Sequence, residues 1–102
     1  MAQFDVHGDR KGKRYPLLLD VQADLLSHLG TRVVVPLAPK RRYPARPIRR
    51  LNPVLTFEGV EYVAVFQELA AIAASELGPV EGSLAKHRAE LIAALELLIT
   101  GS

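Results

Sequence analysis

Cysteine is absent from the sequence, which excludes a disulfide framework and a thiolate metal site. The three histidines, His7, His28 and His87, lie in different parts of the chain, and no pair has a metal-ligand spacing such as HxxxH. The sequence also contains no glycine-rich phosphate loop and no GxSxG motif. We therefore expect neither a metal centre nor a cofactor, and the residues give little support for an enzyme.

Long apolar runs are lacking too. The most apolar segment lies near the C-terminus and is interrupted by Glu90 and Glu96, and no basic-then-apolar leader opens the sequence. We therefore expect a cytoplasmic protein that is neither secreted nor inserted in a membrane.

The 102 residues fit a single domain over the whole length, 1–102, with a small core that favours stabilisation by a partner or a second subunit.

Acidic residues are scarce in the first half of the chain. Residues 1–50 contain eleven Lys or Arg and four Asp or Glu, whereas residues 51–102 contain two and seven. Six of the basic residues lie in the segment KRRYPARPIRR, Lys40 to Arg50, where Pro44 and Pro47 disfavour helix. This segment, called the basic loop below, could be a solvated connection, or could bind nucleic acid or an acidic polypeptide. The charge alone leaves that choice open.

Short runs of apolar and β-branched residues predict an antiparallel β protein. Strands are expected within residues 2–7, 15–22, 31–38 and 52–66, and the last of these is a hairpin with its turn near Glu58-Gly59. Between the first two strands, residues 8–14 contain two glycines and four basic residues, which is typical of an exposed loop.

The C-terminal segment predicts the one clear helix. Ser83 follows Gly82 as a good N-cap, and the helix is expected to run from Leu84 to about Ile99. Apolar residues cover so much of its circumference that it should pack against more than one neighbour, and the second could be another subunit. Residues 67–78 are ambiguous, since their composition favours a helix.

The order of several short strings along the whole chain resembles the CcdB family of toxins from bacterial toxin–antitoxin pairs. The strings are Gln3-Phe4 with Val6; Arg14-Tyr15 after a basic loop; Leu19-Asp20-Val21-Gln22 with Asp24, Leu25 and Leu26; Gly30, Arg32, Val33, Pro36 and Leu37; Leu51, Pro53 and Val54; and His87-Arg88 at the head of the final helix. No string is diagnostic alone, but their shared order and spacing are specific. The resemblance argues for partly extended chain in residues 67–78, while the sequence leaves the structure of residues 67–82 open.

The resemblance implies a mostly β fold with one C-terminal α-helix. This fold is an SH3-like barrel related to the MazF and Kid ribonuclease toxins, with an antiparallel main sheet and a small second sheet. The resemblance also implies a homodimer that acts without catalysis, because toxins of the family bind the A subunit of DNA gyrase, a topoisomerase, and hold its DNA break open. A CcdA-like antitoxin with a disordered acidic tail neutralises them, and operator DNA is contacted only through the toxin–antitoxin complex, in transcription autoregulation.

By the same resemblance, two sets of residues are assigned to partners. The gyrase surface comprises Leu25, Leu26, Glu96, Thr100, Gly101 and Ser102. The antitoxin surface comprises Asp9, Arg10, Lys11, Arg14, Arg41, Arg42, Tyr43 and Arg46. An acidic tail suits these cations better than DNA does, because Tyr43 is the only aromatic ring among the arginines of the basic loop.

The chain departs from the family pattern at its last three residues. Tryptophan, glycine and isoleucine make most of the family's gyrase contact, whereas Thr100, Gly101 and Ser102 stand here. The protein could contact gyrase through a compensating surface, act on another target, or retain only antitoxin binding. The rival hypothesis is a MazF-like ribonuclease, which would need an acid–base pair and arginines in one groove, drawn from Arg14, Asp20 and the basic loop.

Overall fold

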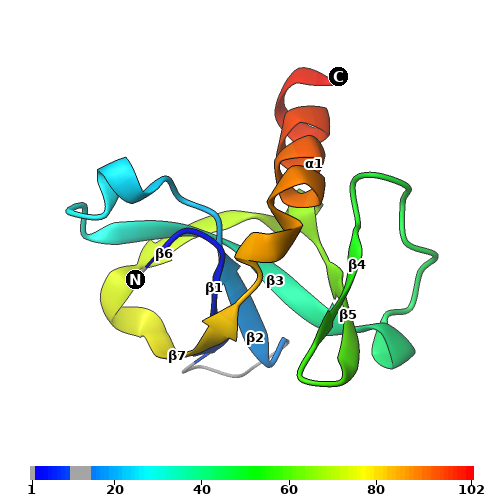
Figure 1. The fold of residues 1–102 in the computed structure, drawn as a ribbon, viewed down its shortest axis with the longest axis horizontal. Coiled ribbons are helices and arrows are strands. Elements are labelled where there is room, and N and C mark those ends of the chain that lie inside the picture. Colours follow the sequence, from blue (N-terminus) through cyan, green and yellow to red (C-terminus); the bar gives the residue numbers. More distant parts are fainter. Residues whose placement is uncertain (1, 10–14) are drawn as a thin grey trace.

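The computed structural model describes residues 2–9 and 15–102, which form a curled antiparallel sheet with a single α-helix standing on it (Figure 1). The strands are β1 (Asp5–Asp9), β2 (Leu17–Asp20), β3 (Thr31–Pro39), β4 (Val54–Phe57), β5 (Val60–Ala64), β6 (Ala70–Ala73) and β7 (Leu77–Ser83). The helix α1 spans Arg88–Thr100, and short 3-10 turns lie at η1 (Asp24–Leu26), η2 (Lys40–Arg42), η3 (Phe66–Glu68), η4 (Ala74–Glu76) and η5 (Ala85–His87). The fold is mostly β with one C-terminal helix, as predicted.

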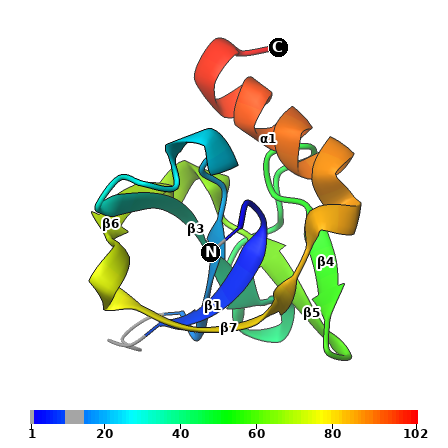
Figure 2. The same cartoon turned by 60° about the vertical axis from the view of Figure 1, so that its left-hand side comes forward.

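The long strand β3 organises the sheet. The strand order is β4-β5-β3-β2-β1-β7, and β6 also pairs with β3. One edge of β3 pairs with β2, while its other edge is divided between β6, at Thr31–Val34, and β5, at Leu37–Pro39. Because β5 and β6 pair with opposite ends of the same edge of β3 and diverge from there, the sheet curls into a half-barrel (Figure 2). All seven strands belong to one sheet, in which β6 pairs with β3, so the small second sheet implied by the resemblance is not separate here.

One face of the sheet holds the main hydrophobic core. Alternate residues of β1, β2 and β3 point into this core, as the two-residue period of a strand requires. The helix α1 closes the core with Leu91 and Ala94, which are both fully buried. The core cluster comprises Phe4, Val6, Leu17, Leu19, Val21, Val35, Leu37, Leu55, Phe57, Ala64, Phe66, Leu84, Leu91 and Ala94.

The opposite face is smaller and contains buried polar residues. His7, Asp20 and Arg32 alternate with the main-core residues of their strands and are at most 1% exposed. His7 Nδ1 lies 3.1 Å from the carbonyl oxygen of Gly78 in β7. The apolar part of this face is a cluster of Leu18, Val34 and Leu77, with Ile72 of β6 packed against it.

Gly82 lets the two ends of the strand order approach each other. A Cβ atom at this position would lie 2.7 Å from a ring carbon of Phe57, which is too close for any side chain. Phe57 of β4 therefore packs directly on the backbone of β7, the strand at the other end of the order. This contact helps to keep the half-barrel curled.

Two stretches differ from what composition favoured. Residues 67–78 are extended apart from 3-10 turns, as the resemblance implied, because β6 pairs with the free edge of β3. The α-helix begins at Arg88 rather than Leu84, since the turn η5 precedes it. The prediction that Ser83 is the N-cap is therefore wrong: Ser83 is the last residue of β7, and the N-cap of α1 is His87, which makes no side-chain capping bond. The Ser83 Oγ only accepts a hydrogen bond from the N–H of Ala85 at 3.1 Å. None of the helices formed by the described residues is long and apolar enough to cross a membrane.

Candidate functional site

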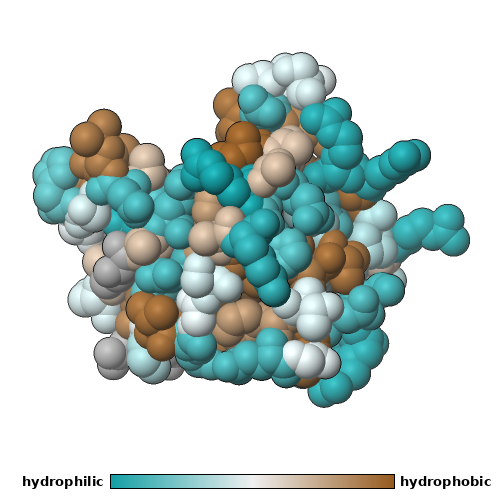
Figure 3. Space-filling view, viewed as in Figure 1, coloured by the Kyte–Doolittle hydropathy of each residue, from teal (hydrophilic) through white to brown (hydrophobic). Residues whose placement is uncertain are grey.

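The C-terminal half of α1 stands away from the sheet (Figures 1 and 2). Ile92, Leu95 and Leu98 are only partly buried against the core, and Ile99 is 70% exposed. Hydrophobic atoms accordingly gather along this part of the helix in Figure 3. A helix that leaves several large apolar residues open in this way presents a surface for another polypeptide.

The terminal segment, Thr100–Ser102, is exposed and ordered by its own hydrogen bonds. Gly101 ends the helix in the left-handed conformation, with φ of 78°, and its N–H donates to the Leu97 carbonyl at 3.0 Å. The Thr100 hydroxyl donates to the Glu96 carbonyl at 2.7 Å and lies 2.8 Å from the Ser102 hydroxyl. Four of the predicted gyrase contacts therefore form one compact group at the end of α1.

The turn η1 carries a second exposed apolar group, formed by Leu25, Leu26 and Leu29 and called the leucine patch below. These residues are 86%, 42% and 43% exposed. The leucine patch and the free half of α1 project from the same side of the sheet (Figures 1 and 3). The structure thus brings the two halves of the predicted gyrase surface to one side of the molecule.

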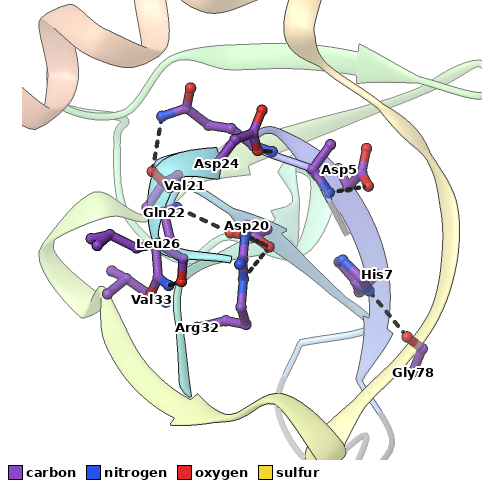
Figure 4. A network of polar contacts seen from close by, with 12 residues as sticks. Asp5, His7, Asp20, Val21, Gln22, Asp24, Leu26, Arg32, Val33 and Gly78 are labelled. Carbon is purple, nitrogen blue, oxygen red and sulfur yellow. Dashed lines mark hydrogen bonds and ion pairs between the residues drawn. The ribbon is translucent and has the colours of Figure 1, made fainter. Parts of the chain in front are cut away.

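A buried ion pair supports the leucine patch (Figure 4). Arg32 Nε donates to Asp20 Oδ2 at 2.8 Å, and Arg32 Nη2 lies 2.7 Å from the same oxygen. Asp20 Oδ1 accepts the backbone N–H of Gln22 at 3.0 Å. The Gln22 side chain in turn donates to the Leu26 carbonyl and accepts the Val33 N–H, each at 3.0 Å. These bonds fix the backbone of the patch to β3.

The N-terminal turn connects the leucine patch to α1. The Gln3 N–H donates to Asp24 Oδ1 at 2.7 Å, and the Gln3 side chain accepts a hydrogen bond from Arg88 at 2.9 Å. Arg88 also lies over the Phe4 ring, 5.8 Å from its centroid. Phe4 has a φ of 69°, which is unusual for a bulky residue, and its N–H is held by the Asp20 carbonyl at 2.6 Å. The patch and the helix therefore share one hydrogen-bonded support.

The basic loop is anchored at its base by Asn52, which is 3% exposed. The Asn52 side chain accepts the N–H of Ile48 at 2.9 Å and donates to the Ala64 carbonyl at 3.2 Å and to Gln67 Oε1 at 2.7 Å. Its backbone N–H donates to the Ile48 carbonyl at 2.8 Å. The buried side-chain amide of Asn52 therefore fixes the backbone conformation at the point where the basic loop rejoins the sheet.

Most cations of the basic loop are exposed. Lys40 approaches Glu61 at 3.8 Å, and both side chains are about half exposed, at 50% and 58%. Tyr43 packs partly against the apolar cluster formed by Ala38, Val63 and Val65, so its ring is not a free stacking surface. Within residues 2–9 and 15–102, no ion pair involves Arg41, Arg42, Arg46 or Arg49.

The other predicted antitoxin contacts belong to the loop after β1. Asp9 is half-buried at the end of β1. Arg10, Lys11 and Arg14 lie outside the described residues. The structure therefore describes the antitoxin surface mainly through the basic loop.

The acid–base residue of the ribonuclease hypothesis is not accessible. Asp20 is 0% exposed and bound to Arg32, so it cannot reach a phosphodiester at the surface. Arg14, the arginine named with it, lies outside the described residues. In the described part of the chain, no group of three or more His, Asp or Glu could hold a metal ion.

Sequence reasoning did not assign a role to three residues that the structure makes important. Gln22 and Arg32 support the leucine patch, and Arg50 donates from its Nη2 to a backbone oxygen of Ser102 at 2.8 Å. The position of Arg32, two residues before Val34 in a predicted strand, was a signal that it faces inward. Nothing in the local sequence signals the contact of Arg50.

Comparison with known proteins identifies the family to which the chain belongs. A protein-family model described as "CcdB protein" matches residues 3–101. Among solved structures, the chain is similar to an endoribonuclease from a mycobacterial species in complex with its cognate antitoxin, with a TM-score of 0.75 and 16% identity. That alignment covers 97% of this chain and 94% of the other, and at this identity it shows a shared fold. Because the family match spans nearly the whole sequence, the chain belongs to the CcdB family.

Proposed function

We propose that the protein is the toxin of a type II toxin–antitoxin pair. It acts in the cytoplasm as a homodimer, binds the A subunit of DNA gyrase and traps the enzyme on cleaved DNA. Membership of the CcdB family supports the class. The target surface is inferred from one observation: the leucine patch and the C-terminal end of α1 project from the same side of the sheet (Figure 3). Trapping requires binding only, so the toxin needs no catalytic group.

The dimer forms through the free half of α1. Ile92, Leu95 and Leu98 are partly open in the single chain, and burying an aliphatic side chain completely contributes about 1.5–3 kcal/mol. In a two-fold symmetric contact each of these residues is buried in both subunits. The same contact brings the two terminal segments close together, which presents the target with a doubled surface.

Leu25 compensates for the missing terminal tryptophan. It is 86% exposed, and its burial against gyrase would contribute up to about 3 kcal/mol. Thr100 has no ring and cannot stack on an arginine of the target. The apolar part of the contact therefore moves from the terminal segment to the leucine patch and to Ile99, which is 70% exposed.

The antitoxin binds through an acidic disordered segment that lies along the basic loop. Arg41, Arg42 and Arg46 are exposed and form no ion pair in the described residues, so their guanidinium groups are open to carboxylates. Exposed charges of this kind accelerate capture of an oppositely charged chain and make the rate sensitive to salt. Operator DNA is reached only through the complex with the antitoxin.

A gyrase cleavage assay tests the proposal. Purified protein is incubated with gyrase and supercoiled plasmid, and linear DNA is counted after the complex is denatured. We expect linear DNA to accumulate, and Leu25→Ser to require about tenfold more toxin, because it removes most of one buried leucine. The matched control is Val80→Ser, which alters a residue that is 51% exposed on β7.

Three results would contradict parts of this proposal. Equal effects of the substitutions at Leu25 and Val80 would remove the leucine patch from the target surface. Cleavage of an RNA transcript by the protein alone would favour the ribonuclease hypothesis. Tight binding of the cognate antitoxin without either activity would indicate a protein that has kept only its inhibitor contact.

A further inference from the structure

The turn η1, which carries the leucine patch, is held mainly by hydrogen bonds. None of the three residues of η1, which all belong to the described part of the chain, is buried. The helix α1, in contrast, is anchored in the main core by Leu91 and Ala94. A segment with few buried contacts has little local stability of its own. The hydrogen bonds of η1 therefore decide where the leucine patch lies relative to α1.

Gln3 connects η1 to α1. Its backbone N–H donates to Oδ1 of Asp24, the first residue of η1, at 2.7 Å. Its side-chain Oε1 accepts a hydrogen bond at 2.9 Å from Nη1 of Arg88, the first residue of α1, and its Nε2 donates to the Val21 carbonyl at 3.2 Å. Figure 2 shows the N-terminal turn, residues 2–5, between η1 and the first turn of α1. Asp24, Gln3 and Arg88 are called the clamp below.

The residue after Gln3 keeps the clamp in place. Phe4 has a φ of 69°, in the left-handed region that bulky residues seldom adopt. Its N–H donates to the Asp20 carbonyl at 2.6 Å, its carbonyl accepts the Leu84 N–H at 2.8 Å, and its ring is buried in the main core. A strained residue that its surroundings hold in place points to a functional constraint nearby. Because Phe4 is fixed in this way, Gln3 has a fixed place between the two elements that it joins.

We propose that the clamp positions the leucine patch for target binding. It keeps the patch at one distance from the free half of α1, so that both groups contact a single target surface together. The clamp residues are positioning residues, and the inference rests on the proposed function for the identity of the target. Without the clamp the target must order the patch as it binds, so we expect about tenfold weaker binding. The hydrogen bonds to Asp24 and Arg88 are exposed, so their loss should hardly change the stability of the fold.

Two variants open the clamp from different sides. Gln3→Leu has a side chain of similar size, removes the bonds to Arg88 and Val21, and leaves the backbone N–H of residue 3 free to bind Asp24. Asp24→Ala removes the acceptor on η1. The matched control is Lys86→Met, which removes an exposed cation two residues before Arg88.

Distances between spin labels test whether the clamp fixes the patch. The chain contains no cysteine, so Ser27→Cys at the end of η1 and Glu96→Cys on α1 give two unique labelling sites. Pulsed electron spin resonance is recorded on the free protein in a large excess of unlabelled chain, so that a dimer contains only one labelled subunit. We expect a narrow distance distribution in the wild type and in Lys86→Met, and a broad one in Gln3→Leu and Asp24→Ala. Equally narrow distributions in all four proteins would overturn the inference.

Affinity for the isolated gyrase A subunit tests the role in binding. It should fall about tenfold in Gln3→Leu and in Asp24→Ala and stay unchanged in Lys86→Met, while the urea midpoint stays near that of the wild type. In the double variant Gln3→Leu with Arg88→Met, the loss should be smaller than the product of the two single losses, because both substitutions break one contact. Independent losses, or losses matched by an equal fall in stability, would mean that these residues only support the fold.

The two measurements separate this inference from the proposed function. If the wild type does not bind the A subunit, the proposed target is wrong, while the distance distributions still decide whether the clamp fixes the leucine patch. If the wild type binds and both clamp variants bind equally well, the positioning role is wrong and the target stands.

Discussion

Replacing Asp20 with alanine is expected to destabilise the fold strongly, because it leaves the Arg32 guanidinium buried without a counter-ion. Arg32 is 1% exposed, and Asp20 is its one ion-pair partner in the described residues. Breaking such a pair from one side costs about 3–5 kcal/mol. The Gln22 N–H also loses the acceptor that it reaches at 3.0 Å, which adds about 1 kcal/mol. The sum is comparable with the whole stability of many small domains, about 5–15 kcal/mol.

Urea unfolding followed by far-ultraviolet circular dichroism measures this loss, at one fixed protein concentration because an oligomer is expected. The double variant Asp20→Leu with Arg32→Met replaces the pair with apolar side chains and should recover at least about 2 kcal/mol relative to Asp20→Ala. The control Glu61→Ala breaks the exposed contact with Lys40, at 3.8 Å, and should cost less than about 1 kcal/mol. An Asp20→Ala variant within about 1 kcal/mol of the wild type, or a double variant no more stable than it, would refute the reasoning.

Three further outcomes follow from the packing. Gly82→Ala should lower the free energy of unfolding by about 1–3 kcal/mol, because its methyl group meets the Phe57 ring at 2.7 Å. Gly30→Ala, where no atom lies within 4 Å, should leave the melting temperature nearly unchanged, and equal effects would contradict the close contact. Leu98→Glu should convert a dimer to a monomer in sedimentation velocity, whereas an unchanged sedimentation coefficient would place the dimer contact elsewhere. Gln22→Leu should weaken gyrase binding more than antitoxin binding in calorimetric titrations, and equal losses would mean that Gln22 supports the fold alone.

The sequence predicted the strands and the last helix because their patterns are local. Apolar runs marked β2 and β3, and positive φ values at Glu58 and Gly59, 51° and 79°, confirm the predicted turn. Residues 67–78 could not be placed from composition, since their alanines and leucines favour a helix. What decides their structure is the free edge of β3, a long-range partner that outweighs intrinsic propensity.

The supports of the candidate site were harder to predict than its exposed residues. The resemblance pointed to Leu25 and Leu26, which are exposed, but it assigned no role to Arg32. The alternation of β3 places Arg32 on the same face as Val34, and an inward arginine requires a buried acid. Finding that acid requires the register between β2 and β3, which places Asp20 opposite Val34, and no single-strand pattern gives a register.

The terminal residues Thr100, Gly101 and Ser102, where the sequence departs from the family pattern, contribute little to the packing of the fold. The last fully buried residue of α1 is Ala94, and every residue from Ile99 onward is exposed, so substitutions there remove little packing. The leucine patch, in contrast, is held through Gln22 by the same ion pair that stabilises the second face of the sheet. Substitutions in the terminal segment can therefore change what this surface binds while hardly changing the free energy of unfolding. These bonds hold the leucine patch in a fixed geometry, so the gyrase contact that we propose depends mainly on this patch.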